Sequence, residues 1–189
     1  HLAIDATGVK VFGEGEWKVK KHGAEKRRKW VKLHLGVDGH THQVVSAEIT
    51  TSSVGDSEVL PGLLRPLRRQ IDAISGDGAY DTKQCYKEIS KKKSKPLIPP
   101  RSNAGYWEDE HPRNDVVAEL KDGKLAEWKL ESGYHRRSIS ETAMYRYKQL
   151  ISGKVSLRDY NGQVGEILSG VWAMNKICTL GMPVRQEIS

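Results

Sequence analysis

Long apolar segments, cysteine and phenylalanine are all scarce in this chain of 189 residues, which contains two cysteines and one phenylalanine. The longest apolar run covers only residues 171–174, far short of the ~20 residues that a membrane-spanning helix needs. No apolar segment near the start predicts a signal peptide. Cys85 and Cys178 are too few for a disulfide framework or a cysteine-rich metal site. We therefore expect a cytoplasmic protein with no membrane partner.

The remaining composition is sufficient for one folded domain. Hydrophobic residues make up 37% of the chain, and five tryptophans and seven tyrosines argue against disorder. A chain of ~150 residues already buries about 70% of its unfolded surface. We therefore expect residues 1–189 to form a single domain. Because the chain begins at His1, already within a strand-like pattern, we also expect it to be a fragment that lacks its own N-terminal segment.

Positive charge is unevenly distributed along the chain. Lysine and arginine number 31 against 24 acidic residues, a net charge of +7. Residues 18–32 hold eight basic side chains and one acidic one; a second cluster covers residues 91–95, and a third contains Arg136, Arg137, Arg146 and Lys148. Any one cluster could be solvated surface. Three clusters interleaved with tryptophan and tyrosine favour binding to a phosphate backbone.

The hydrophobic pattern predicts a mixed α/β fold. Alternating or β-branched segments predict five strands, over residues 2–11, 30–37, 44–49, 71–76 and 95–98. Helical patterns cover residues 58–69, 81–92, 125–151 with a break near Gly133, and 160–180. The polar stretch 101–123 is expected to be a loop. This order predicts a mixed five-stranded sheet flanked by helices.

Two aspartates lie where a structural role is hard to assign. Asp5 lies within a strand pattern, where aspartate is depleted, although the end or edge of a strand would tolerate it. Asp77 follows a strand between two glycines, where backbone can approach a ligand closely, although a turn aspartate is the simpler alternative. Asp81 is expected to cap the helix over 81–92, with Gln84 completing a capping box. We therefore assign Asp77 to chemistry and Asp81 to structure.

A third carboxylate, Glu141, lies on a predicted helix that also carries basic side chains. At 100° per residue, Tyr134, Arg137, Glu141 and Lys148 share a stripe about 60° wide. A surface ion pair between Arg137 and Glu141 would explain only two of the four. Three carboxylates on different elements can hold two divalent cations that activate a water for phosphodiester displacement. Oxygen ligands favour Mg²⁺ or Mn²⁺, and the neighbouring Arg137 and Lys148 would hold phosphates.

The spacing Tyr134-x2-Arg137-x3-Glu141-x6-Lys148 resembles the signature helix of bacterial insertion-sequence DDE transposases of the IS-four/IS-five-like group. Residues 4–8 (IDATG) resemble the family's first-Asp strand, and residues 75–81 (SGDGAYD) its second-Asp segment. Residues 13–17, 95–100 and 131–137 also look like this family. The resemblance therefore covers nearly the whole chain.

This resemblance implies a ribonuclease H-like fold and a specific chemistry. Asp5, Asp77 and Glu141 would bind two Mg²⁺ or Mn²⁺ ions for cleavage at the ends of a mobile element, followed by attack of the freed 3′-hydroxyl on target DNA. Arg137 and Lys148 would contact DNA near the scissile phosphate, with Tyr134 supporting the same face. The partners implied are double-stranded DNA and a second copy of the chain, in a bacterial cytoplasm near the nucleoid. The family's N-terminal segment for end recognition is not expected in a chain with four residues before Asp5.

Several alternatives stay open. A different ribonuclease H-like nuclease would share the fold and metals, and a truncated transposase remnant could bind DNA without cutting it. A zinc site from His34, His40 and His42 is a third alternative, weakened by the lack of a cysteine partner. We also expect residues 18–32 to form an arm on the DNA backbone. Neutralising its central cations (Lys26, Arg27, Arg28 and Lys29) should then flatten the salt dependence of DNA binding.

Overall fold

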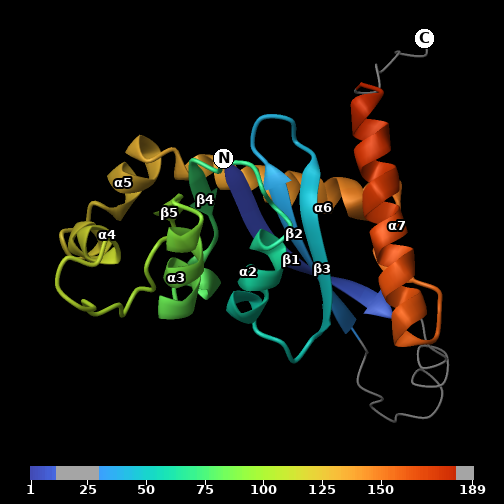
Figure 1. Ribbon diagram of the computed structural model, residues 1–189, viewed down its shortest axis with the longest axis horizontal. Helices are drawn as coiled ribbons and strands as arrows, with labels where there is room; N and C mark the ends of the chain where they lie inside the picture. The colour runs from blue at the N-terminus through green and yellow to red at the C-terminus, as the bar shows by residue number, and fades with distance from the viewer. Residues whose placement is uncertain (12–29, 182–189) are drawn as a thin grey trace.

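The computed structural model describes residues 1–11 and 30–181, which fold around one mixed β-sheet (Figure 1). The strands are β1 (Leu2–Val11), β2 (Trp30–Asp38), β3 (Val44–Thr51), β4 (Ala73–Ser75), β5 (Lys95–Leu97) and β6 (Lys154–Val155). Their order is β3-β2-β1-β4-β5, with β6 pairing to β1. The predicted mixed sheet is confirmed. The extra strand β6 has two residues, too few to show an alternating pattern.

Helices lie on both faces of this sheet. They are α2 (Asp56–Leu64), α3 (Lys83–Lys91), α4 (Arg113–Lys121), α5 (Leu125–Glu131), α6 (Ser138–Leu150) and α7 (Tyr160–Thr179), with short 3-10 helices η1 (Gly78–Tyr80) and η2 (Tyr134–Arg137). None of those in the described part of the chain is long and apolar enough to cross a membrane. The expected break near Gly133 is confirmed, because Gly133 adopts a left-handed φ of 72° between α5 and η2.

The expected loop over residues 101–123 is wrong in its second half, where α4 forms. Few apolar residues mark this helix, and its buried side chains are Arg113, Val116 and Val117. Its start is fixed by a partner distant in sequence, since the buried Arg113 guanidinium pairs with Asp81. Local pattern could not predict a helix that depends on such a tertiary contact.

The predicted capping role of Asp81 is also wrong. Helix α3 begins at Lys83, and the Thr82 hydroxyl accepts the capping hydrogen bond from the Cys85 N–H at 3.2 Å. Asp81 is buried, and its Oδ2 accepts a hydrogen bond from Arg113 Nη2 at 2.8 Å. Asp81 is therefore structural, as expected, but through an ion pair.

The two sheet faces carry separate hydrophobic cores. One core joins β2 residues such as Leu33 and Leu35 to α6 and α7, and the other joins Ile4 to α2 and α3. Asp5 is paired with Leu35 in the antiparallel register of β1 and β2. Paired residues point to the same face, so the Asp5 side chain lies on the α6 side of the sheet.

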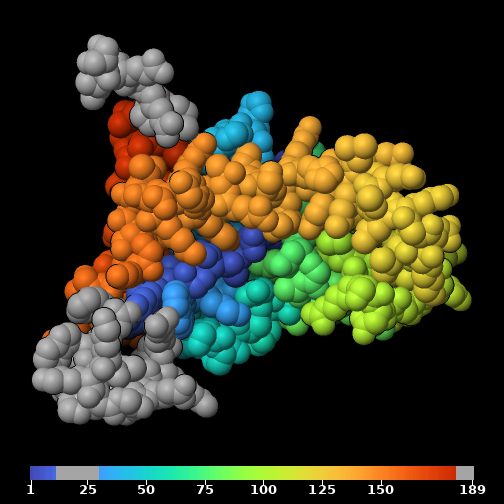
Figure 2. All heavy atoms as spheres, turned by 180° about the vertical axis from the view of Figure 1, so that it is seen from behind, coloured from blue at the N-terminus to red at the C-terminus, as the bar shows by residue number. Residues whose placement is uncertain are grey.

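One edge of β1 is open along its middle. Strand β4 pairs with Leu2 and Ala3, and β6 pairs with Lys10 and Val11. Between these two short ladders, residues 4–9 have no strand neighbour on this edge within the described ranges. Figure 2 shows β1, in blue, at the surface between α6 in orange and segments in teal and green. Asp5 lies within this open stretch.

Candidate active site

Asp5 is half-buried and held from two sides. Its Oδ1 accepts a hydrogen bond from the Ala6 N–H at 2.8 Å, and its Oδ2 accepts one from Arg137 Nη1 at 3.0 Å. Burial raises the pKa of Asp5 above its usual value; the Ala6 N–H and the Arg137 guanidinium oppose this shift, and the charges of Asp77 and Glu141 add to it. Asp77 and Glu141 are therefore both close enough to act electrostatically on Asp5.

Arg137 joins two of these carboxylates. It ends η2 and directly precedes α6, so Glu141 lies one helical turn further on. Arg137 Nη2 donates a hydrogen bond to Glu141 Oε1, while Nη1 contacts Asp5. One guanidinium thus bridges β1 and α6, and Arg137 reaches Asp5 across 132 residues of sequence. The ion pair between Arg137 and Glu141 forms, and Asp5 is a second partner of the same guanidinium.

Asp77 approaches the same place from the neighbouring strand. It follows β4 and caps η1, with its Oδ1 accepting the Ala79 N–H at 2.9 Å. The parallel register pairs Ala3 of β1 with Ser75 of β4. Beyond this pair β4 ends, but the chain still runs close to β1, since a Cβ on Gly76 would lie 3.1 Å from Ile4 Cγ1. This close approach next to Asp77 agrees with the influence of the Asp77 charge on Asp5.

Tyr134 lies beneath Arg137 and contributes little exposed surface. The Tyr134 side chain is buried, its ring centroid is 6.0 Å from that of Trp128, and Arg137 Cζ is 5.9 Å from the same ring. Tyr134 and Arg137 belong to a 3-10 helix, so the expected single α-helical stripe from Tyr134 to Lys148 is wrong in its first turn. Tyr134 nevertheless packs against the arginine that reaches Asp5.

The remaining basic residues lie apart from the carboxylates. Lys148 is exposed near the end of α6, seven residues beyond Glu141 and therefore ~10 Å along the helix. It lies beside the end of β1 and near Lys154 of β6, a neighbour that no sequence pattern indicated. The four cations assigned to the basic arm (Lys26, Arg27, Arg28 and Lys29) lie outside the described residues.

Comparison with known proteins adds to this geometry. The family model described as a transposase DDE domain matches residues 1–176. This chain belongs to the transposase DDE domain family. Among solved structures it is similar to a piggyBac transposase in a cryo-EM synaptic complex with hairpin DNA, with 12% identity and a TM-score of 0.55. The match covers 98% of this chain and 49% of that one, so the DDE domain spans about half the length of that transposase. The similarity supports the predicted ribonuclease H-like fold.

In the described part of the DDE domain, metal-ligating side chains are not grouped around a common centre. Within the described ranges, no group of three or more His, Cys, Asp or Glu side chains could hold a metal ion as it stands. At the predicted site, Arg137 occupies the position between Asp5 and Glu141. The three histidines of the zinc alternative are in different environments. His34 is buried and hydrogen-bonded to Thr50, whereas His40 and His42 are exposed.

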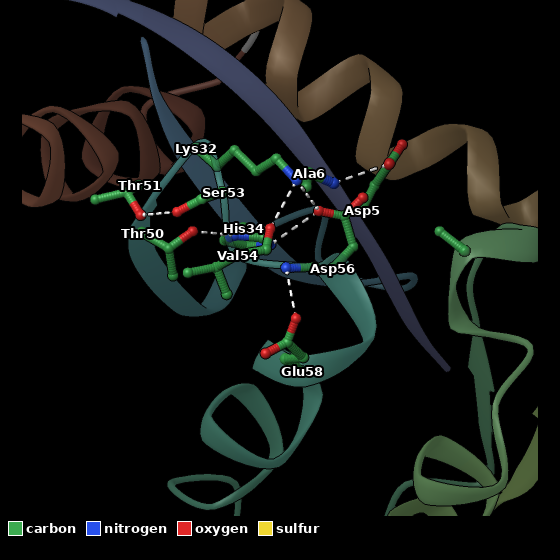
Figure 3. Close-up of polar contacts among 12 residues, drawn as sticks. Asp5, Ala6, Lys32, His34, Thr50, Thr51, Ser53, Val54, Asp56 and Glu58 are labelled. Atoms are coloured by element: carbon green, nitrogen blue, oxygen red, sulfur yellow. Dashed lines mark hydrogen bonds and ion pairs between the residues drawn. The ribbon is translucent and has the colours of Figure 1, made fainter. Parts of the chain in front are cut away.

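His34 belongs to a polar network on the opposite face of the DDE domain's sheet (Figure 3). Its Nε2 is 2.9 Å from the Thr50 hydroxyl, and its buried Nδ1 lacks a hydrogen-bond partner and lies 3.8 Å from Asp56 Oδ1. Lys32 Nζ donates to the same Asp56 oxygen at 3.0 Å. Burial lowers the pKa of His34; the Asp56 carboxylate opposes this shift, and the Lys32 ammonium adds to it.

We expect His34 to make the DDE domain sensitive to mild acid. Because its folded pKa is below the unfolded value of ~6.5, its contribution to stability is present above that pH and is lost as pH falls. Urea unfolding at several pH values measures this effect. Below about pH 6.5, the free energy of unfolding of wild type should fall more steeply with decreasing pH than that of His34→Gln. The difference between the two slopes should correspond to the uptake of up to about one proton on unfolding. Equal slopes for the two proteins would contradict this assignment.

Proposed function

We propose that this chain is the catalytic domain of a bacterial insertion-sequence transposase of the IS-four/IS-five-like group. It cleaves DNA at the ends of the element and joins the freed 3′-hydroxyl to target DNA. The observation that carries this proposal is that Arg137 bridges Asp5 of β1 and Glu141 of α6, with Asp77 following the neighbouring strand β4, in a chain of the transposase DDE domain family. The similar piggyBac transposase is in complex with hairpin DNA, which agrees with a DNA partner for this chain.

The carboxylates fit divalent cations in charge and donor type. Asp5, Asp77 and Glu141 offer only oxygen ligands, which suit Mg²⁺ or Mn²⁺. Their mutual repulsion is offset at present by one bridging guanidinium, so added positive charge would be favourable there. We assign two such ions to this site, where they would supply an activated water and stabilise the leaving oxygen.

The other polar residues then act on the DNA strand. With cations on the carboxylates, the Arg137 guanidinium becomes available for the scissile phosphate, which it can grip with two parallel N–H donors. The Tyr134 ring, itself packed against Trp128, lies 5.9 Å from Arg137 Cζ and helps to hold the guanidinium in place. Lys148 lies ~10 Å further along α6 and would hold a phosphate of the same strand. The basic arm would grip the duplex nearby.

Two features of the proposal concern assembly. Cutting and joining both ends of an element requires two active sites, so we propose a homodimer on two DNA ends. A net charge of +7 favours association of such a complex with DNA and makes its affinity strongly salt-dependent.

A nicking assay tests this function directly. Supercoiled plasmid is incubated with the 189-residue chain and Mg²⁺ or Mn²⁺, with Asp77→Ala as the inactive variant and Asp72→Ala as a matched control on the same segment. We expect metal-dependent nicking that Asp77→Ala loses and Asp72→Ala, which removes an exposed carboxylate, keeps. Nicking that survives Asp77→Ala would refute the site. DNA binding without nicking by any of the three proteins would favour the non-catalytic alternative.

A further inference from the structure

A basic hollow lies at the far end of β1 from the carboxylates. It has a volume of about 430 Å³ and lies where β1, β6 and the end of α6 meet. The residues that line it are Gly8, Lys10, Trp30, Lys148, Ser152, Gly153 and Lys154. Among these there is no acidic side chain, so the described lining has a single sign of charge. Of these residues, the proposed function uses only Lys148.

Trp30 gives this hollow a flat aromatic surface. It begins β2 opposite Lys10, and its indole lies so close to Gly8 that a Cβ there would be 3.1 Å from a ring atom. Gly8 therefore lets the ring rest on the backbone of β1. Even so, Trp30 remains 40% exposed. A tryptophan whose only task was to fill the core would be largely covered.

An aromatic ring surrounded by lysines is the chemistry that binds single-stranded nucleic acid. Bases stack on the ring, and the lysines neutralise the phosphates on either side. A base within a duplex has both faces covered by its neighbours, so only an unpaired base can stack in this way. The hollow therefore favours an unpaired nucleotide over intact duplex.

The distance between the carboxylates and the hollow is short enough for one DNA strand to contact both. Gly8 is three residues from Asp5 along β1, or ~10 Å, and Lys148 is ~10 Å from Glu141 along α6. Both elements therefore span the same length, but Trp30, which pairs with Lys10, lies on the sheet face opposite to Asp5, so the strand would also cross the open edge of β1. The length along the elements alone corresponds to about three nucleotides at a 3.4 Å rise per nucleotide, so the separation is at least that many.

We propose that this hollow is a subsite for an unpaired nucleotide of the DNA strand, at least about three positions from the phosphate at the carboxylates. Trp30 stacks on the base, and Lys148 and Lys154 hold the flanking phosphates. The position along the strand rests on the proposed function. The binding of an unpaired base rests on the hollow alone.

The test measures binding without metal, so that cleavage plays no part. Fluorescence anisotropy with a labelled single-stranded oligonucleotide in EDTA compares wild type with Trp30→Ala, Trp30→Phe and Trp172→Ala. Trp172 is 81% exposed on α7 and serves as the matched control. We expect Trp30→Ala to bind about tenfold more weakly, ~1.4 kcal/mol, and Trp30→Phe and Trp172→Ala to stay close to wild type. Equal affinities of Trp30→Ala and Trp172→Ala would overturn the proposal.

Two further measurements separate stacking from damage to the fold. Lys154→Ala keeps the ring and should lower the slope of log affinity against log salt by ~0.7 for single strands. A single abasic site can be moved along the oligonucleotide. It should weaken binding by wild type at one position and have no such effect on binding by Trp30→Ala. A uniform response at every position would overturn the proposal. Because these outcomes need no nicking, they hold or fail independently of the nicking assay.

Discussion

Asp81→Ala is expected to lower the free energy of unfolding by about 3–5 kcal/mol, as is typical when one partner of a buried ion pair is removed. The side chains of Asp81 and Arg113 are 2% and 4% exposed. Arg113 Nη2 donates to Asp81 Oδ2 at 2.8 Å, and Nη1 donates to the Gly105 carbonyl at 2.7 Å. Without Asp81, a buried guanidinium would remain with no counter-charge.

The same pair fixes the polar segment between α3 and α4. The Arg113 guanidinium lies 4.1 Å from the Trp107 ring, and that ring packs edge-on against Tyr86 of α3. We therefore expect Asp81→Ala to loosen residues 101–112, which should become sensitive to limited proteolysis under conditions where wild type resists it. Urea unfolding followed by circular dichroism gives the change in free energy.

Lys83→Ala is the matched control for this prediction. It removes an ion pair with Glu108 in the same region, but both side chains are 63% exposed, so the expected loss is below about 1 kcal/mol. The double replacement Asp81→Leu with Arg113→Met removes both charges and should recover much of the stability. Similar losses for Asp81→Ala and Lys83→Ala would contradict the assignment of Asp81 to structure.

This contrast also explains how far the sequence could predict the fold. Strands β1 to β3 each carry a β-branched or alternating pattern over eight residues or more, and the long patterns of α6 and α7 are equally local, so all were predictable. Helix α4 and the role of Asp81 were not. Each depends on the other across 32 residues, and nothing in either segment alone indicates the partner.

The candidate site divides in the same way. Asp5, Asp77 and Glu141 could be chosen from the sequence because each lies in an unusual local setting and because the family resemblance sets their spacing. The bridge from Arg137 to Asp5 could not be predicted, since it spans 132 residues and depends on how α6 packs on β1. Tyr134 was expected on one helix stripe with Arg137, Glu141 and Lys148, but it is buried in a 3-10 turn that follows Gly133 and packs against Trp128.

Arg137→Gln is expected to tighten Mn²⁺ binding in the absence of DNA by about tenfold. The guanidinium contacts both Asp5 and Glu141, so a cation that binds these carboxylates must displace or repel it. A unit charge ~5 Å from a divalent ion costs ~1.7 kcal/mol even at the dielectric constant of water, which is slightly more than tenfold in affinity. Removing the charge should therefore favour the metal, although the same variant should nick DNA poorly.

Electron paramagnetic resonance of free Mn²⁺ measures this affinity without any turnover. Arg136→Gln is the matched control, because it removes the same charge from an exposed neighbouring side chain. Its Mn²⁺ affinity should stay close to wild type. Equal affinities of Arg137→Gln and Arg136→Gln would show that Arg137 does not compete with the metal.

Competition of this kind also couples metal binding to DNA binding. A phosphate at the site gives the Arg137 guanidinium another partner and so releases the carboxylates for cations. Adding an oligonucleotide duplex should therefore tighten Mn²⁺ binding to the Asp77→Ala variant, which retains Asp5, Glu141 and Arg137 but is not expected to cut. The gain should shrink in the double variant Asp77→Ala with Arg137→Gln, where no guanidinium has to move. An equal gain in both proteins would mean that DNA assists the metal by a route independent of Arg137.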